Sequence, residues 1–207
     1  MKLLILGAAG KIGQLVTEDV INDQNVELTL FAHDAQKRLA KFASHKNVKF
    51  VDGDFLDQDA MDKAMQGQNM VVLAYMPKKD PEAKVIVDAM EKAGVKRCVI
   101  TGAFGIFNEL EEPMRTKQEK LAHGYDGPLY TQLKKDAKLF DDSQVDDTYL
   151  RMPWLNDEDT EELEVVPKGK MMHGAGVSRK AVAKLISKIV KDPSLYSNDN
   201  IGLQGLK

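Results

Sequence analysis

The sequence predicts an α/β protein with a three-layer, doubly wound parallel sheet. Three observations favour this class. Short apolar segments alternate with amphipathic ones along most of the chain. Within the apolar segments, polar residues do not occur at every second position, as they do in a half-exposed strand. Glycines at positions 7, 10 and 13 lie where the first apolar segment gives way to the first amphipathic one. Strands that alternate with helices form parallel sheets with right-handed crossovers. Helices on both faces require strands that are apolar on both faces.

Six apolar segments are the predicted strands, and Pro77 ends the fourth. They are residues 3–6, 26–32, 48–51, 70–75, 97–101 and 148–151. The chain has 207 residues, of which 43% are apolar. This length and composition suit one sizeable core, so we expect a single domain over residues 1–207.

Six segments show the periodicity of helices with one apolar face. The fourth has Pro81 at its start and Gly94 after its end, the usual asymmetry of helix termini. The last is capped by Ser178 and followed by Pro193. The predicted helices are residues 11–21, 35–43, 58–65, 81–93, 130–142 and 178–190.

Gly7, Gly10 and Gly13 follow the first strand at three-residue spacing. A strand that breaks at glycine and continues as a helix exposes backbone N–H groups at the positive end of the helix dipole, which suits a dinucleotide pyrophosphate. The three glycines allow the tight turn, the close approach of the phosphates and the packing of helix on strand. A plain strand–helix turn is the alternative. The predicted pyrophosphate-binding residues are Gly7, Ala9, Gly10, Lys11, Ile12 and Gly13.

The segment GAAGKIG, together with the strand–helix alternation, resembles the atypical short-chain dehydrogenases/reductases with a GxxGxxG pattern. The NmrA-like and the flavin- or biliverdin-reductase-like members are the nearest match, over almost the full length. This resemblance implies a Rossmann-like, NAD(P)-binding fold. Residues 52–55 look like the family's GD-hydrophobic motif, so Asp54 and Phe55 are expected beside the adenine. Residues 148–155 are similar to its T-hydrophobic-hydrophobic-R-P segment, with Met152 inserted before the Pro.

The resemblance also places the other end of the cofactor. Residues 71–75 match the strand that leads to the nicotinamide ribose, so Ala74, Tyr75 and Met76 are expected there. We expect the cofactor to be NADP, with NAD as the alternative.

The end of the second predicted strand decides between these two cofactors. A carboxylate there accepts the ribose hydroxyls of NAD, whereas a cation takes the 2′-phosphate of NADP. His33 stands where the family often has Arg, and Arg38 follows in the next helix. We expect both to contact the cofactor. Asp34, if it turned inward, would favour NAD, and surface roles for His33 and Arg38 are the alternative.

Tyr130 and Lys134 form Tyr-x-x-x-Lys on one side of a predicted helix. In the wider superfamily that the chain resembles, this Tyr protonates the developing alkoxide while the Lys lowers its pKa, which is general acid catalysis beside a hydride donor. Thr101 is the one hydroxyl near the place of the companion Ser. Thr101, Tyr130 and Lys134 are therefore the candidate catalytic residues, and a solvated helix face is the alternative reading.

Charge and composition exclude several functions. The net charge of −3 argues against nucleic acid, and no apolar run is long enough for a membrane span. The N-terminal segment does not resemble a signal peptide. One cysteine excludes an internal disulfide, so we expect a cytoplasmic protein. The four histidines lack metal-binding spacing, and we expect no metal. The expected partner is a small-molecule substrate, with the protein a monomer or a homodimer.

Two segments, residues 102–127 and 153–176, interrupt the alternation and follow predicted strands, so they should lie at the carboxyl edge of the sheet, where ligands bind. Methionine and aromatic residues in and near them could line an apolar pocket. We therefore expect an enzyme, an NADP-preferring reductase that transfers hydride to a small carbonyl, quinone or flavin. A non-catalytic NAD(P)-binding redox sensor of the NmrA type is the alternative, and an NAD-dependent epimerase or dehydratase a weaker one.

Overall fold

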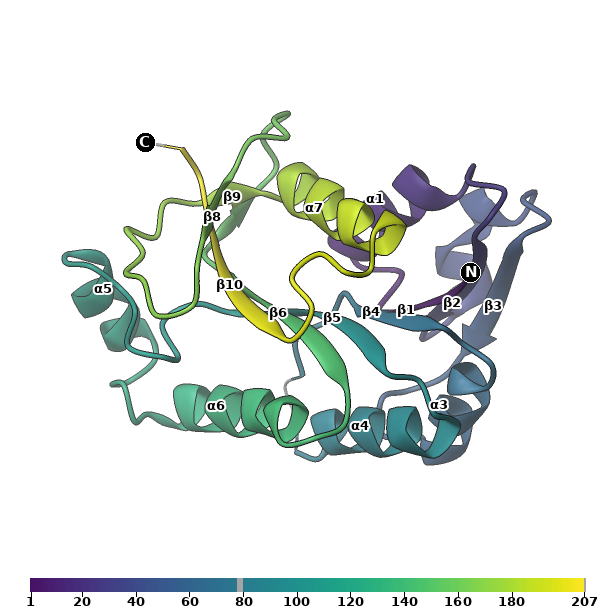
Figure 1. The fold of residues 1–207 in the computed structure, drawn as a ribbon, viewed down its shortest axis with the longest axis horizontal. Coiled ribbons are helices and arrows are strands. Elements are labelled where there is room, and N and C mark those ends of the chain that lie inside the picture. Colours follow the sequence, from purple (N-terminus) through teal and green to yellow (C-terminus); the bar gives the residue numbers. More distant parts are fainter. Residues whose placement is uncertain (78–79, 207) are drawn as a thin grey trace.

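A twisted, eight-stranded sheet runs through the centre of the structure (Figure 1). The computed structural model describes residues 1–77 and 80–206. The described strands are β1 (Lys2–Leu6), β2 (Glu27–Ala32), β3 (Val48–Asp52), β4 (Met70–Leu73), β5 (Arg97–Ala103), β6 (Asp146–Met152), β7 (Leu155–Asn156), β8 (Glu164–Val166), β9 (Val177–Ser178) and β10 (Asp199–Gln204).

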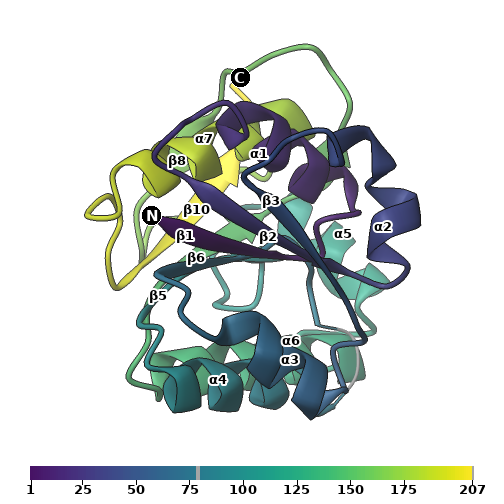
Figure 2. The same cartoon turned by 90° about the vertical axis from the view of Figure 1, so that its right-hand side faces the viewer.

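Helices cover both faces of this sheet, so the predicted three-layer, doubly wound fold is confirmed. Helices α1 and α7 lie on one face, and α3, α4 and α6 lie on the other (Figures 1 and 2). The described helices are α1 (Lys11–Val20), α2 (Ala35–Arg38), α3 (Gln58–Met65), α4 (Glu82–Ala93), α5 (Met114–Leu121), α6 (Pro128–Asp141) and α7 (Arg179–Lys191), with a short 3₁₀ helix at Ala40–Phe42.

The strand order is β3-β2-β1-β4-β5-β6-β10-β8, so the direction of winding reverses between β1 and β4. Strands β1 to β6 and β10 are parallel, and β8 pairs antiparallel to β10. In open α/β sheets, ligands bind at the carboxyl ends of the strands where the order reverses. The topology therefore points to the carboxyl ends of β1 and β4.

Alternate residues of each central strand enter two separate cores. Leu3 and Ile5 pack with α1 and α7, whereas Leu4 and Leu6 pack with α3, α4 and α6. Successive side chains of a strand point to opposite faces, so a strand covered on both sides must be apolar at every position. This explains the unbroken apolar runs of the sequence.

Three of the differences from the sequence-based expectation have a clear physical reason. The segment predicted as one helix over residues 35–43 divides at Leu39, whose φ of −114° is not helical. Helix α5 lies within the segment expected to be a loop, and it has no buried residue and hence no apolar face to reveal it. Strand β10, with the sequence DNIGLQ, was not expected because only two of its residues are strongly apolar.

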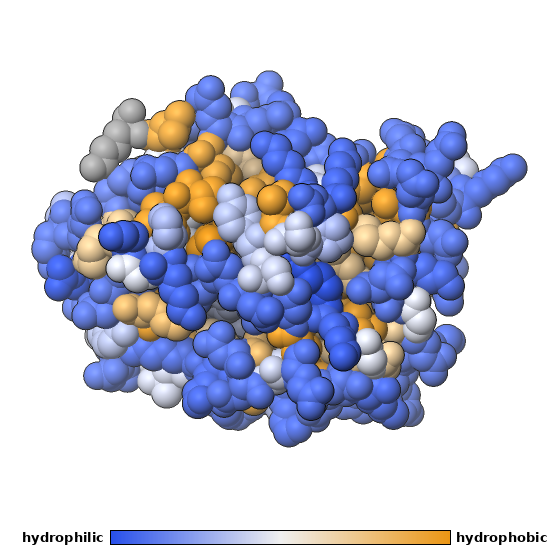
Figure 3. All heavy atoms as spheres, viewed as in Figure 1, coloured by the Kyte–Doolittle hydropathy of each residue, from blue (hydrophilic) through white to orange (hydrophobic). Residues whose placement is uncertain are grey.

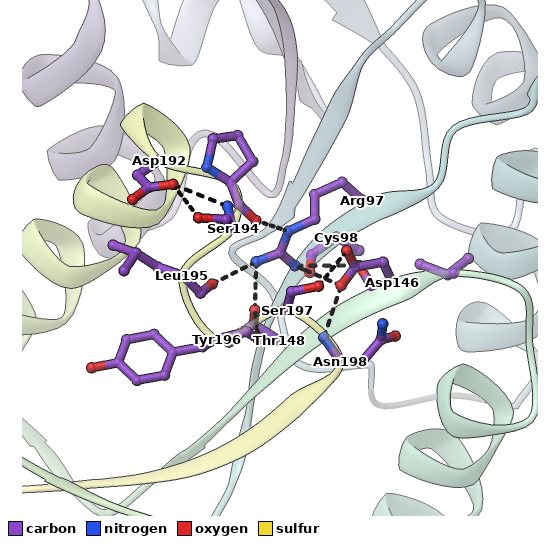
Figure 4. Close-up of polar contacts among 12 residues, drawn as sticks. Arg97, Cys98, Asp146, Thr148, Asp192, Ser194, Leu195, Tyr196, Ser197 and Asn198 are labelled. Atoms are coloured by element: carbon purple, nitrogen blue, oxygen red, sulfur yellow. Dashed lines mark hydrogen bonds and ion pairs between the residues drawn. The ribbon is translucent and has the colours of Figure 1, made fainter.

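A buried arginine fixes the loop that leads into β10 (Figure 4). Arg97 is 7% exposed and donates hydrogen bonds to the carbonyl oxygens of Pro193 at 2.9 Å and Leu195 at 3.0 Å, and to Thr148 Oγ1 at 2.7 Å. Hydrogen bonds from a charged donor are about twice as strong as neutral ones. The guanidinium therefore attaches the chain before β10 to the amino ends of β5 and β6, opposite the edge where ligands are expected.

The face of the molecule seen in Figure 3 is covered mostly by hydrophilic side chains, with apolar ones in patches between them. Within residues 1–77 and 80–206, no helix combines the length and the apolar character needed to cross a bilayer.

The carboxyl of Asp147, in β6, is a buried group that should make stability depend on pH. It is 8% exposed, and burial raises its pKa from 3.8 to about 6, assisted by the charge of Asp141 and opposed by Arg97. A raised carboxyl pKa means that the folded state binds the proton more tightly, so stability falls as pH rises from about 4 to about 6.

We predict that Asp147→Asn increases the free energy of unfolding by up to about 3 kcal/mol near neutral pH and has almost no effect near pH 4. Urea unfolding of both proteins at the two pH values measures this difference. Asp142→Asn is the control, because the exposed Asp142 pairs with Lys138 at the surface and should change stability little at either pH. An equal effect of Asp147→Asn at both pH values would contradict the prediction.

Candidate cofactor and substrate site

The turn between β1 and α1 lies at one end of the sheet and contains bonded N–H groups, before the helix, as well as available ones, in the first turn of the helix. Gly7 has a φ of +74°, and its N–H, like that of Ala8, donates to the Phe31 carbonyl at 3.1 Å. The N-cap of α1 is Gly10, and among the described residues no side chain caps the helix. The N–H groups of the first turn and the positive end of the helix dipole are therefore available to an anion.

Close packing of α1 on β1 depends on a missing side chain at Gly13. A Cβ at this position would lie 2.7 Å from the Gly7 carbonyl oxygen and 2.8 Å from the Cα of Ala8. Both contacts are with backbone atoms, which cannot move aside without displacing the helix. Gly13 thus sets the distance between the helix and the strand, and Gly10 stands at the helix terminus itself.

A first cavity of about 350 Å³ opens at this turn. It lies along the carboxyl ends of β1 to β4, at the position where the strand order reverses. Nine of the expected cofactor-binding residues meet there. The residues around it are Gly7, Ala9, Gly10, Ala32, His33, Arg38, Gly53, Asp54, Phe55, Ala74, Tyr75 and Glu82.

Two basic side chains, His33 and Arg38, reach the first cavity from the end of β2 and from α2. Asp34 adopts a left-handed backbone conformation, and its carboxylate lies 3.0 Å from His33 Nδ1. The Arg38 guanidinium donates to the His33 carbonyl at 3.3 Å. Asp52 accepts hydrogen bonds from the N–H groups that begin α2. Asp34 is therefore held toward His33, outside the set of described residues that line the cavity.

Tyr75 stands between this cavity and a second one. Its ring stacks on Phe55 with centroids 4.3 Å apart, and its hydroxyl donates to a carboxylate oxygen of Glu82 at 3.1 Å. Burial, followed by the charge of Glu82, raises the pKa of Tyr75 to about 12, so the phenol stays neutral. A Cβ on Gly7 would lie 2.8 Å from the Cβ of Tyr75, which shows how tightly the glycine turn packs on this residue.

The second cavity, of about 320 Å³, shares Ala74 and Tyr75 with the first and is mainly apolar. Residues of both segments that interrupt the alternation line it, and they lie at the same end of the molecule (Figure 1). The ammonium of Lys117, in α5, lies 3.9 Å from the centre of the Trp154 ring and connects the two segments. The lining comprises Ile12, Ala74, Tyr75, Met76, Thr101, Gly102, Ala103, Phe104, Gln118, Leu129, Tyr130, Leu133, Met152, Pro153, Trp154 and Leu155.

Two of the three candidate catalytic residues meet in the second cavity. Tyr130 is 1% exposed and its hydroxyl donates to the Phe104 carbonyl at 3.4 Å, while Thr101 Oγ1 donates to the Leu73 carbonyl at 2.8 Å. Burial raises the pKa of Tyr130 to about 12. Lys134 is not among the described residues that line this cavity.

The ammonium of Lys134 instead donates to the Tyr125 carbonyl at 2.8 Å and lies 3.3 Å from the centre of the Tyr125 ring. Tyr125 in turn packs edge-on against Tyr130. Four expected cofactor residues are not among the described residues that line the first cavity. Lys11 pairs with Asp157 at 2.6 Å, Gly13 packs against the backbone of Gly7 and Ala8, and Ile12 and Met76 line the second cavity.

A buried ion pair, which the sequence analysis did not anticipate, holds both loop segments over the site. Arg151 is 1% exposed and lies 3.5 Å from Glu109, which is 4% exposed. Glu109 accepts hydrogen bonds from the N–H groups of Gly105 and Phe107, and Arg151 donates to the carbonyls of Val166 and Pro167. Arg151 belongs to the segment already noted as a family motif, but nothing in the sequence indicated its partner.

A profile of the NAD(P)H-binding family matches residues 7–193 of the chain. Among solved structures, the fold is similar to a short-chain dehydrogenase/reductase from Veillonella parvula in complex with NADP, at 23% identity over 98% of this chain and 94% of that one, with a TM-score of 0.87. A Rossmann-fold NAD(P)-binding family protein from Shigella flexneri is 30% identical over 99% of this chain and 93% of that one, with a TM-score of 0.78.

Among curated relatives, the oxidoreductase aprR from Aspergillus flavus is 29% identical over 99 residues, which are 48% of this chain and 32% of that protein. The matched segments thus span about a third of the length of the curated relatives.

The fold and the glycine turn define a nicotinamide-dinucleotide-binding protein. The chain belongs to the NAD(P)H-binding family, whose profile covers most of its length. The residues fit this cofactor, because the glycines leave room for phosphates, the helix terminus is uncapped among the described residues, and the basic residues His33 and Arg38 line the first cavity. The expected cofactor, NADP with NAD as the alternative, is therefore confirmed at the level of the family.

We predict that Gly10→Ala weakens NADPH binding by roughly tenfold or more, about 1.4 kcal/mol, while the protein stays folded. The backbone of Gly10, with φ −74° and ψ 163°, accepts an alanine, and the nearest atom to its Cβ would be the Gly7 carbonyl oxygen at 3.2 Å. The methyl group would project at the helix terminus where a phosphate must approach. Isothermal titration calorimetry measures the affinity and thermal unfolding measures the stability.

Gly67→Ala is the matched control. Gly67 has a φ of +70° with open space around it, so an alanine there should lower stability and leave NADPH affinity unchanged. Wild-type affinity in Gly10→Ala would contradict a pyrophosphate site at this turn.

Proposed function

We propose that this protein is an NADPH-dependent reductase that transfers hydride to a flat, apolar acceptor such as a quinone or a flavin, or to a small carbonyl, in the second cavity. The proposal rests on one observation, that the residues lining two adjoining cavities differ in polarity. The first combines a glycine turn with the basic residues His33 and Arg38, and the second is apolar with two buried hydroxyls, of Thr101 and Tyr130. A dinucleotide that spans them has its nicotinamide at the apolar end.

Each part of the chain has a defined task in this proposal. The glycine turn and the α1 terminus hold the pyrophosphate, Asp54 and Phe55 contact the adenine side, and residues 74–76 contact the nicotinamide ribose. When bound, NADPH supplies the hydride. The apolar walls exclude water, which strengthens polar interactions inside the cavity. The hydroxyls of Thr101 and Tyr130, which donate to backbone carbonyls in this structure, would turn to donate to the acceptor, while Lys134 positions Tyr130 through Tyr125.

The placement of Lys134 also favours a second candidate function, an NAD(P)-binding redox sensor of the NmrA type. Lys134 contacts Tyr125, and the pKa of Tyr130 is raised by burial. This is the opposite of the lowered pKa that an efficient general acid near neutral pH requires. The sensor hypothesis expects NADPH binding without oxidation.

We predict NADPH oxidation in the presence of quinones or flavins and slower oxidation with small aldehydes, because aromatic ring systems fill an apolar cavity of this size better. Loss of absorbance of the reduced nicotinamide under anaerobic conditions measures the rate. Trp154→Ala should raise the KM for the aromatic acceptor several-fold without changing NADPH affinity. Leu195→Ala, at the opposite edge of the sheet, is the control. Tight NADPH binding with no oxidation by any acceptor would favour the sensor.

We further propose that the enzyme prefers NADP to NAD. His33 and Arg38 line the first cavity where the adenosine ribose would lie, and the carboxylate of Asp34 is held by His33. A 2′-phosphate would be paired by the Arg38 guanidinium, with His33 beside it, and the ribose hydroxyls of NAD would lack their usual carboxylate acceptor.

We predict that Arg38→Ala lowers NADPH affinity by about tenfold and leaves NADH affinity unchanged, since only NADPH carries the extra phosphate charge. Lys37→Ala is the matched control, because Lys37 is the neighbouring cation in α2 and is not among the described residues that line the cavity. Parallel calorimetric titrations with both nucleotides provide the test. A loss of equal size for NADH and NADPH would show that Arg38 does not recognise the phosphate.

A further inference from the structure

Asp136, in α6, carries a buried oxygen that the reductase proposal does not use. The residue is 7% exposed, and its Oδ1 accepts a hydrogen bond from Gln132 Nε2 at 2.8 Å. Within residues 1–77 and 80–206, no protein group forms a hydrogen bond with its Oδ2. Buried polar atoms are nearly always hydrogen-bonded, so this oxygen requires a partner other than a described side chain.

A narrow cleft beside Asp136 has the size for that partner. Its volume is about 10 Å³, on the scale of a single water molecule. The cleft adjoins the second cavity, because the two share Met76, Thr101, Gly102 and Leu133. Asp136 and Tyr149 complete the polar lining.

The other polar groups around the cleft have unused hydrogen-bonding capacity. The Tyr149 hydroxyl accepts from the Ala103 N–H at 3.4 Å, which leaves its own proton to donate. The Thr101 hydroxyl donates to the Leu73 carbonyl, which leaves its oxygen to accept. A water could thus accept from Tyr149 and from a protonated Asp136 Oδ2, and donate to the Thr101 oxygen. Three partners are typical of a buried structural water.

We propose that one water in this cleft connects the Asp136 carboxyl to Thr101, and that Asp136 is the proton reserve for the reduction of an acceptor in the second cavity. This proposal rests on the reductase function. The acceptor gains a hydride, which bound NADPH supplies, and a proton, which Thr101 Oγ1 releases once its hydroxyl has turned from the Leu73 carbonyl toward the acceptor. Thr101 regains a proton from the water, the water regains one from the Asp136 carboxyl, and Asp136 is reprotonated from solvent between turnovers.

The surroundings of Asp136 raise the pKa of its carboxyl above the ordinary value. Burial is the largest influence and raises its pKa, and the charges of Asp80 and Glu82 act in the same direction. The hydrogen bond from Gln132 and the charge of Lys135 oppose them. Tyr149, on the facing strand, has its own pKa raised by burial and is a neutral donor. A protonated carboxyl can supply a proton, whereas an ionised one cannot.

The first test is a titration of the protein without nucleotide. Carbon-13 NMR of labelled aspartate, assigned with Asp136→Asn, reports the pKa of the Asp136 carboxyl. We expect this pKa to lie above the ordinary aspartate value and to change in Thr101→Val, which keeps the side-chain shape and removes the hydroxyl. An unchanged titration in Thr101→Val would overturn the connection between the two residues. This readout is independent of activity, so it separates failure of this proposal from failure of the reductase function.

The second test is kinetic. Asp136→Asn should lower kcat roughly tenfold, leave NADPH affinity unchanged, and remove the decline of kcat that accompanies ionisation of Asp136 as pH rises. A merely structural role would not alter the pH profile. Asp142→Asn, at the exposed end of the same helix, should behave as wild type. A wild-type pH profile in Asp136→Asn would overturn the proposal.

Discussion

The close contact between α1 and β1 is the constraint on which the rest of the structure depends. Gly13 lets the helix approach until its backbone contacts that of Gly7 and Ala8, and Tyr75 packs on the other side of the same turn. This distance brings the uncapped helix terminus to the point where the strand order reverses. A side chain at position 13 would displace the helix and with it the free N–H groups. The cofactor site is thus a consequence of backbone packing.

The two cavities differ in polarity because different strands end beside them and contribute different residues. The ends of β2 and β3 contribute charged residues, whereas the segments after β5 and β6 contribute apolar ones. The buried pair of Arg151 and Glu109 holds both of those later segments, in addition to the contact of Lys117 with Trp154.

Much of this arrangement could be predicted from the sequence, because its signals are local. The glycine spacing and the apolar runs predicted the doubly wound parallel sheet, and together with the family resemblance they named nine of the residues that line the first cavity. Strand β10 was not predicted, because it is buried by its neighbours in the sheet and not marked by an apolar composition of its own. Helix α5 was not predicted, because it has no apolar face. The sequence analysis did not single out Asp136, because its importance comes from an unpartnered oxygen that only the fold reveals. The position of the Lys134 side chain was also not predicted, because it depends on the fold of the loop that carries Tyr125.

The most direct test of the central claim, that the dinucleotide spans both cavities with its nicotinamide in the apolar one, is NMR of methyl-labelled methionine. Met76 and Met152 line the second cavity, and their signals can be assigned with single Met→Leu variants. We expect NADP to shift both signals, and adenosine 2′,5′-bisphosphate, which lacks the nicotinamide, to bind without shifting them. Binding of NADP that leaves both signals unmoved would contradict the account.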